Sequence, residues 1–127
     1  MKIESWNVRG CNHPINIKTL ARKIKQERPD VLFLQQTNCS LEALMKLGNI
    51  ICKGSNVMAT GVEGMAMLWH PRTVEISRCR ASHFYIMAEF KVLGSRITWM
   101  LVNTYGPSSI PQKQAFIHHL KWLSDLA

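Results

Sequence analysis

Residues 29–37, PDVLFLQQT, decide the fold of this chain. Pro29 ends a helix-forming segment, because the residue before a proline is pushed out of the helical region. The run 31–34 is apolar throughout, which is expected of a short strand covered on both faces. It ends in two neutral amides, Gln35 and Gln36. The stretch therefore predicts a buried strand whose polar end reaches the edge of a sheet.

The residues before this strand complete a strand–helix–strand unit. Residues 1–8 predict a strand, because Ile3, Trp6 and Val8 are spaced among polar positions. Residues 9–14 form a loop, and Asn16 is the expected cap of a helix that ends near Arg28. Its apolar stripe has the spacing i, i+3, i+4, i+7 and consists of Ile17, Leu20, Ala21 and Ile24. Two strands joined by a helix are expected to be parallel.

The rest of the chain is predicted to be rich in strands. A short helix is expected over 41–47, capped by Ser40 and stopped by Gly48. Segment 54–64 is expected to be a mobile loop, and a last helix begins near Gln112. The strand candidates are residues 50–52, 65–69, 74–77, 84–92 and 96–103.

Composition sets the class of protein. The 127 residues are 46% hydrophobic and 19% charged, which is typical of one globular domain. No apolar run is long enough to cross a membrane, so we expect no membrane partner. The N-terminus shows no secretory signal, and the four cysteines form no CxxC pair. These features predict reduced thiols and a nuclear or cytoplasmic protein that is not secreted.

The chain is strongly basic. Sixteen Lys and Arg residues against eight acids give a net charge of +8. Such a chain favours polyanions, because each neutralised phosphate releases condensed counterions. DNA is therefore the expected partner, and solubility alone is the alternative reason for the charge. The basic helix 16–28 is most simply a solvated amphipathic face, with a DNA role for this helix as the alternative.

Four motifs in order carry a family resemblance: SWNVRG (5–10), PDVLFLQQT (29–37), GMAMLW (64–69) and LVNTYGP (101–107). Together they resemble the apurinic-type endonuclease/exonuclease/phosphatase domain of LINE-like non-LTR retrotransposons, particularly those of plants. The resemblance covers the whole chain but only about half of the family's domain. It implies an α/β fold, in which 1–127 is the truncated N-terminal half of a four-layer α/β sandwich of the DNase I-like fold. Such a half would supply roughly one sheet, whose exposed apolar face would promote self-association.

The resemblance also assigns site residues. Asn7 matches an asparagine that positions metal and phosphate, and Tyr105 matches a tyrosine that contacts the substrate phosphate. Arg9 lies in a loop that contacts DNA. Gln36 stands where the family has a metal-binding glutamate, and Glu63 replaces the first glycine of a paired-glycine turn. Asn7 at a strand end also fits an ordinary turn residue.

The family activity is hydrolysis of DNA phosphodiester bonds with Mg²⁺. Mg²⁺ prefers oxygen ligands that include a carboxylate, and Gln36 offers none. The family's Asp-x-Asn and Asp-His pairs are also absent, since Asp30 and Asp125 are the only aspartates. We therefore expect weak Mg²⁺ binding and no catalysis. The alternatives are a nucleic-acid-binding remnant without chemistry and a gene fragment without function. Trp69 and Trp99 are expected to pack in the sheets.

Overall fold

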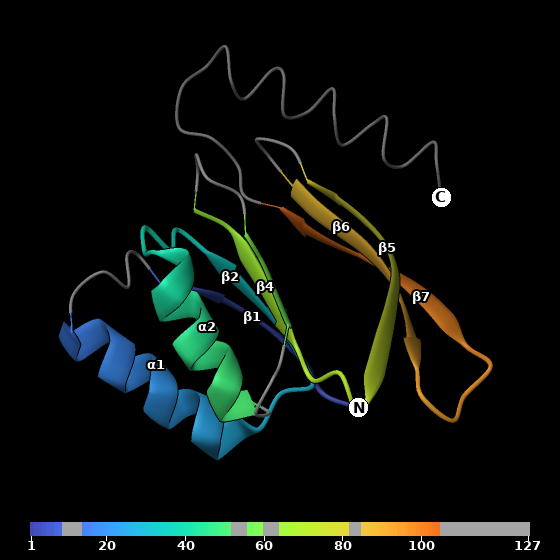
Figure 1. The fold of residues 1–127 in the computed structure, drawn as a ribbon, viewed down its shortest axis with the longest axis horizontal. Helices are drawn as coiled ribbons and strands as arrows, with labels where there is room; N and C mark the ends of the chain where they lie inside the picture. Colours follow the sequence, from blue (N-terminus) through green and yellow to red (C-terminus); the bar gives the residue numbers. More distant parts are fainter. Residues whose placement is uncertain (9–13, 52–55, 60–63, 82–84, 105–127) are drawn as a thin grey trace, which may run out of the picture.

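The computed structural model describes residues 1–8, 14–51, 56–59, 64–81 and 85–104. Within these residues the chain forms two helices and two sheets. The helices are α1 (Pro14–Glu27) and α2 (Leu41–Ile51). The strands are β1 (Ile3–Asn7), β2 (Val31–Gln35), β3 (Asn56–Ala59), β4 (Ala66–Trp69), β5 (Val74–Ala81), β6 (Tyr85–Val92) and β7 (Thr98–Thr104). Figure 1 shows three layers, in which the helices cover one face of the first sheet and the second sheet lies against its other face.

The first sheet has the strand order β1-β2-β4-β3. β1 and β2 are parallel, as the strand–helix–strand pattern predicts, with Ile3 opposite Val31 and Asn7 opposite Gln35. β4 runs antiparallel to both β2 and β3. The carboxyl ends of β1 and β2 therefore lie at one edge of the sheet, beside the beginning of β4.

Residues 31–34 of β2 are all apolar, and both faces of the strand are covered. Leu32 and Leu34 point to the helices and join a cluster with Leu20 and Ile24 of α1 and Leu44 of α2. The alternate residues point to the second sheet and belong to a separate cluster between the sheets. That cluster consists of Val31, Phe33, Met65, Met67, Val74, Ile86, Ala88 and Phe90.

The second sheet is an antiparallel meander with the order β5-β6-β7. Its pairing continues from Tyr85 opposite Thr104 to Lys91 opposite Thr98, and a register shift interrupts β5 between Ile76 and Arg78. The presence of this second sheet corrects the prediction that the chain supplies roughly one sheet. It also buries the face that we expected to be exposed, since Val31 and Phe33 are 0% and 4% exposed.

Several predicted boundaries differ from those in the structure. α1 begins at Pro14 rather than after Asn16, and proline suits the first helical position since it needs no N–H partner there. α2 continues past Gly48 to Ile51, so that residues 50–51 are helical rather than strand. Leu44, Leu47 and Gly48 form its buried face. Ser40 is confirmed as the cap, because its Oγ accepts a 3.1 Å hydrogen bond from the Ala43 N–H.

Other predictions have mixed outcomes. Residues 56–59 form β3 within the segment that was predicted to be a loop, because they pair with β4. Cys39 is disulfide-bonded, which corrects the prediction of four reduced thiols, while Cys79 is a free thiol. Trp69 packs beside the cluster between the sheets, whereas Trp99 is 46% exposed.

The predicted last helix lies outside the described residues. No helix in the described segments is long and apolar enough to cross a membrane.

Candidate functional site

The carboxyl ends of β1 and β2 bring two predicted site residues to one edge. Asn7 is exposed, and it lies opposite Gln35 in the parallel pair. The Val8 N–H continues the pairing with a 3.0 Å hydrogen bond to the Gln35 carbonyl. Gln36 follows directly and is half-buried. Asn7 is therefore the last residue of β1, and Gln36 directly follows the last residue of the neighbouring parallel strand β2.

The chain turns sharply after β2. Gln36 has φ 54° and Asn38 has φ 44°, which places both in the left-handed region. This conformation is costly for most L-residues, although asparagine adopts it more readily. Thr37, between them, is 2% exposed, and its N–H donates a 2.6 Å hydrogen bond to the Gly64 carbonyl. The turn 36–38 is thus held against the segment that enters β4.

Gly64 makes this contact in a conformation that only glycine adopts easily. Its φ is 66°, and an added Cβ would lie 2.9 Å from the Asn38 nitrogen and 3.0 Å from the Thr37 nitrogen. Glu63, which the sequence resemblance sets in place of the first glycine of a paired-glycine turn, lies outside the described residues. Gly64, the next residue, has the backbone conformation that favours glycine.

A network of buried amides joins the two sheets beside this edge. The Gln35 Nε2 group donates a 2.6 Å hydrogen bond to the Asn103 Oδ1 atom of β7 and a 2.8 Å bond to the Ser5 Oγ atom of β1. The Asn103 Nδ2 group donates to the carbonyls of Leu34 and Ala66, at 3.4 and 3.3 Å. Gln35 and Asn103 are 8% and 3% exposed. Because an unpaired buried amide is costly, this network fixes how the second sheet meets the end of β2.

Comparison with known proteins identifies the fold. The family model of the Endonuclease/Exonuclease/phosphatase family matches residues 5–124. The chain belongs to this family. A solved structure of a functionally unknown conserved protein from Enterococcus faecalis V583 is 14% identical with a TM-score of 0.71. That match covers 98% of this chain and 61% of the solved chain, so this chain spans less than two thirds of its length. No curated protein matches.

Among the residues that the family resemblance assigned, the structure describes Asn7 and Gln36. Both lie at the edge where β1 and β2 end. Arg9 and Tyr105 lie outside the described residues. Tyr105 comes two positions after Asn103, whose side chain is held by the amide network. The roles of all four residues remain predictions.

The described residues at this edge do not fit a tightly held Mg²⁺ ion. The Endonuclease/Exonuclease/phosphatase family generally uses divalent metal ions. Here the polar side chains at the edge are all neutral: Asn7, Gln36, Thr37, Asn38 and Asn103. In the described part of the chain, no three His, Cys, Asp or Glu residues are grouped so as to hold a metal. Amides offer oxygen ligands without the negative charge that a hard cation requires.

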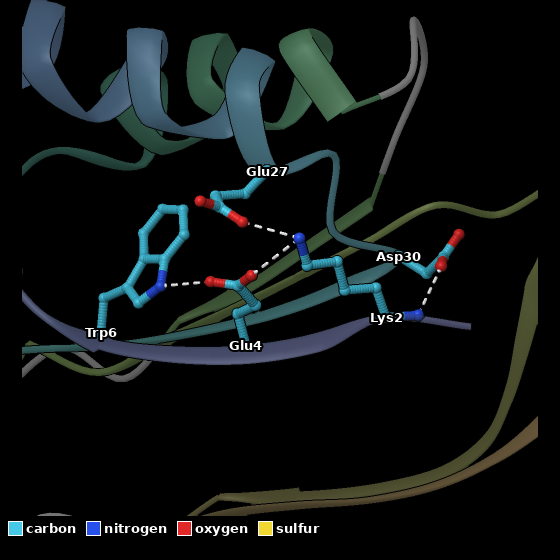
Figure 2. A network of polar contacts seen from close by, with 5 residues as sticks. All are labelled: Lys2, Glu4, Trp6, Glu27 and Asp30. Carbon is cyan, nitrogen blue, oxygen red and sulfur yellow. Dashed lines mark hydrogen bonds and ion pairs between the residues drawn. The ribbon is translucent and has the colours of Figure 1, made fainter.

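The acids near β1 serve a different purpose at the opposite end of the sheet. Figure 2 shows the Lys2 Nζ atom between two carboxylates, 2.6 Å from Glu27 of α1 and 3.3 Å from Glu4 of β1. Glu4 also accepts a 2.7 Å hydrogen bond from the Trp6 indole. Asp30 accepts a 2.8 Å bond from the Lys2 backbone N–H, so it ties β1 to the start of β2.

Within this Lys2 clamp, defined as Lys2, Glu4 and Glu27, the contact between Lys2 and Glu27 shifts the pKa values of both of these residues. Hydrogen bonding to Glu27 raises the pKa of Lys2 above 10.5, and the same contact lowers the pKa of Glu27 below 4.5. Lys2 and Glu27 are therefore both ionised at neutral pH. The ion pairs of the Lys2 clamp join β1 to α1, so these side chains have a structural role.

Sequence reasoning missed Gln35, Asn103 and Ser5. The signal for Gln35 was a polar residue that continues an apolar strand, in phase with Val31 and Phe33. Asn103 carried a similar signal near the end of its strand. Their pairing was not visible, because the two residues are 68 positions apart.

Proposed function

We propose that this chain is a retrotransposon-type member of the Endonuclease/Exonuclease/phosphatase family that no longer hydrolyses DNA phosphodiester bonds. The family match supports a nuclease or phosphatase ancestry. The resemblance of its motifs to LINE-like endonucleases of plants supports DNA as the ancestral substrate. The observation that carries the loss of activity is the neutral donor set at the ends of β1 and β2.

The exchange at Gln36 removes charge without changing size. A glutamine fills the same volume as a glutamate and keeps one oxygen ligand, so the fold has no reason to change. It cannot supply the negative charge that stabilises a bound Mg²⁺ ion. Loss of a residue that merely supports a metal ligand weakens binding by about 10–100-fold, so loss of a ligand charge should weaken it by about 100-fold or more.

The described strand ends also lack a second acid. Hydrolysis needs a water that is activated and a metal that polarises the phosphate. In the described part of the chain no three His, Cys, Asp or Glu residues are grouped so as to hold a metal. Asp30 binds the Lys2 backbone N–H at the other end of the sheet. Gln36→Glu alone should therefore improve metal binding without restoring turnover.

A paired experiment tests both halves of this proposal. Supercoiled plasmid is incubated with the protein and Mg²⁺, and nicking is followed on a gel, while Mn²⁺ affinity is measured by water proton relaxation. We expect no nicking above a buffer control, and tighter Mn²⁺ binding by Gln36→Glu than by wild type. Gln26→Glu is the matched control, since it adds the same charge at an exposed position of α1. Nicking by wild type that Asn7→Ala abolishes would refute the proposal, and equal Mn²⁺ affinity of all three proteins would refute the role of Gln36.

Partner and location follow from the same proposal. A DNA partner would place the protein in the nucleus or cytoplasm, whereas the disulfide at Cys39 is a feature more common outside those compartments. Self-association is also proposed, through the exposed apolar side chains of β7. These are Trp99, Met100 and Val102, which are 46%, 52% and 39% exposed.

A further inference from the structure

The outer face of α1 carries an uninterrupted row of positive charge. Lys18, Arg22 and Lys25 are all exposed, and they are spaced i, i+4, i+7. At 3.6 residues per turn they fall within an arc of about 60° and extend about 10 Å along the helix axis. The opposite side of α1 is buried through Leu20 and Ile24. We refer to these three residues as the α1 stripe.

A helix face that is merely exposed to solvent does not need the like charges of the α1 stripe. A solvated helix face is stabilised by pairs of opposite charge at i, i+4, and like charges at that spacing destabilise the helix. α2 follows the usual pattern, since Glu42 and Lys46 form an i, i+4 ion pair at 3.9 Å. α1 instead places Lys18 four residues before Arg22, so its outer face is less stable than a mixed one.

No acid offsets the α1 stripe among the residues that the structure describes. α1 contains four basic residues and a single acid, Glu27. Glu27 is bonded to the Lys2 Nζ atom at 2.6 Å, on the side that faces β1. The fourth base, Lys23, lies 4.3 Å from the centre of the Trp6 ring on that same side. In the described segments no ion pair involves Lys18, Arg22 or Lys25.

The α1 stripe is also placed to continue toward the candidate site. α1 runs back between the parallel strands β1 and β2, so its first turns lie at the end of the sheet where those strands finish. Lys18 is the stripe residue nearest that end. A chain of phosphates that followed the stripe would therefore be led toward Asn7 and Gln36.

We propose that the α1 stripe is a metal-independent docking surface for the phosphate backbone of duplex DNA, separate from the strand-end site. The inference deepens the proposed function, because it rests on DNA as the partner. Three cations spaced over about 10 Å suit a duplex, which presents one phosphate charge per about 1.7 Å of axis. The contacts neutralise phosphate and read no base, so binding is independent of sequence.

The test measures binding to a short labelled DNA duplex by fluorescence anisotropy, in EDTA and over a series of salt concentrations. The stripe variant carries Lys18→Gln, Arg22→Gln and Lys25→Gln. Loss of three phosphate contacts should make the slope of log K against log salt shallower by about 2.7. Over a fourfold rise in salt, wild type then loses about 40-fold more affinity than the variant.

A matched control removes the same charge elsewhere. It carries Arg72→Gln, Arg78→Gln and Lys91→Gln, all exposed and near or within β5 and β6. We expect this control to keep the wild-type slope. The melting temperature gives a second readout, since removal of like-charge pairs should leave the stripe variant as stable as wild type or slightly more stable. A binding loss that came from damaged structure would lower the melting temperature instead.

Three outcomes would overturn the proposal. Wild type could fail to bind duplex at low salt, or the control could lose as much slope as the stripe variant, which would indicate diffuse charge. Phosphatidylserine vesicles could also compete as well as unlabelled duplex at equal charge, which would indicate a general polyanion surface. Because EDTA removes divalent metal, these results are independent of the nicking assay. Nicking with Mg²⁺ would refute the loss of activity while leaving the docking surface intact.

Discussion

Gly64 should tolerate substitution less well than Gly94, which provides its control. Both have positive φ, 66° and 84°, but an added Cβ at Gly94 meets nothing within 4 Å. An alanine in the left-handed region destabilises the folded state by about 1–2 kcal/mol. The lower conformational entropy of the unfolded alanine variant offsets about 0.4–1 kcal/mol of this loss. Gly94→Ala should therefore lower the free energy of unfolding by about 0.5–1 kcal/mol.

Gly64→Ala adds a steric term that cannot relax. The new Cβ would lie 2.9 Å from the Asn38 nitrogen. The Thr37 N–H is bonded to the Gly64 carbonyl at 2.6 Å, so moving apart would break that bond. Overpacking of this kind costs about 1–3 kcal/mol, which brings the total to about 2–4 kcal/mol.

Thermal unfolding followed by circular dichroism measures the difference. A chain of this size loses about 4 °C of melting temperature per kcal/mol, from an unfolding entropy of about 2.1 cal/mol/K per residue. We expect a drop of about 2–4 °C for Gly94→Ala and about 10 °C for Gly64→Ala. Equal drops would show that the turn 36–38 is not held against residue 64, and the described geometry of the site edge would be wrong.

Two further predictions concern the Lys2 clamp and β7. Glu27→Gln should lower the melting temperature between about pH 5 and 10. It should do so by more than Glu42→Gln, which removes only the more exposed 3.9 Å ion pair with Lys46. The stability that Glu27 contributes is present above its ordinary pKa of 4.5 and is lost as the pH falls through its lower folded pKa. The stability that Lys2 contributes is lost as the pH rises above 10.5. A difference in melting temperature between wild type and Glu27→Gln that persists at pH 2 would contradict this. Met100→Lys should reduce concentration-dependent association, measured by light scattering, because Met100 is 52% exposed on β7. The control is Leu41→Lys, at a residue that is 57% exposed on α2, and it should leave association unchanged. Wild type that remains monomeric at every concentration would refute the β7 surface.

Periodicity in the sequence was sufficient for the first half of the fold. The all-apolar run 31–34 predicted a strand covered on both faces, and clusters on each side of β2 confirm it. The stripe of Ile17, Leu20, Ala21 and Ile24 predicted the buried face of α1, where Leu20 and Ile24 are 8% and 1% exposed. These signals are local, so a single sequence contains them.

The errors came from positions where a partner far along the chain decides the structure. Gly48 carries a helix-stop signal, but α2 continues because Leu44, Leu47 and Gly48 share its buried face. Residues 56–59 have loop composition, but they extend because β4 offers an unpaired edge. The amide network was missed for the same reason, since Gln35 finds its acceptor in Asn103 only after the two sheets pack.

The two adjacent glutamines show how fold and chemistry separate at this edge. Gln35 is 8% exposed and bonded to both Ser5 and Asn103, so its loss would leave buried polar groups without partners. Gln36 lies one residue further, where the strand has ended and the chain turns with φ 54°. A glutamate at this position would have the same size, so a change from glutamate to glutamine would leave packing unchanged while it removed a charge. Selection for folding would therefore preserve Gln35 but would not resist such a change at position 36. Under the function proposed above, in which Gln36 stands in place of a metal-binding glutamate, membership of the Endonuclease/Exonuclease/phosphatase family is evidence for the sheet edge and not for the reaction.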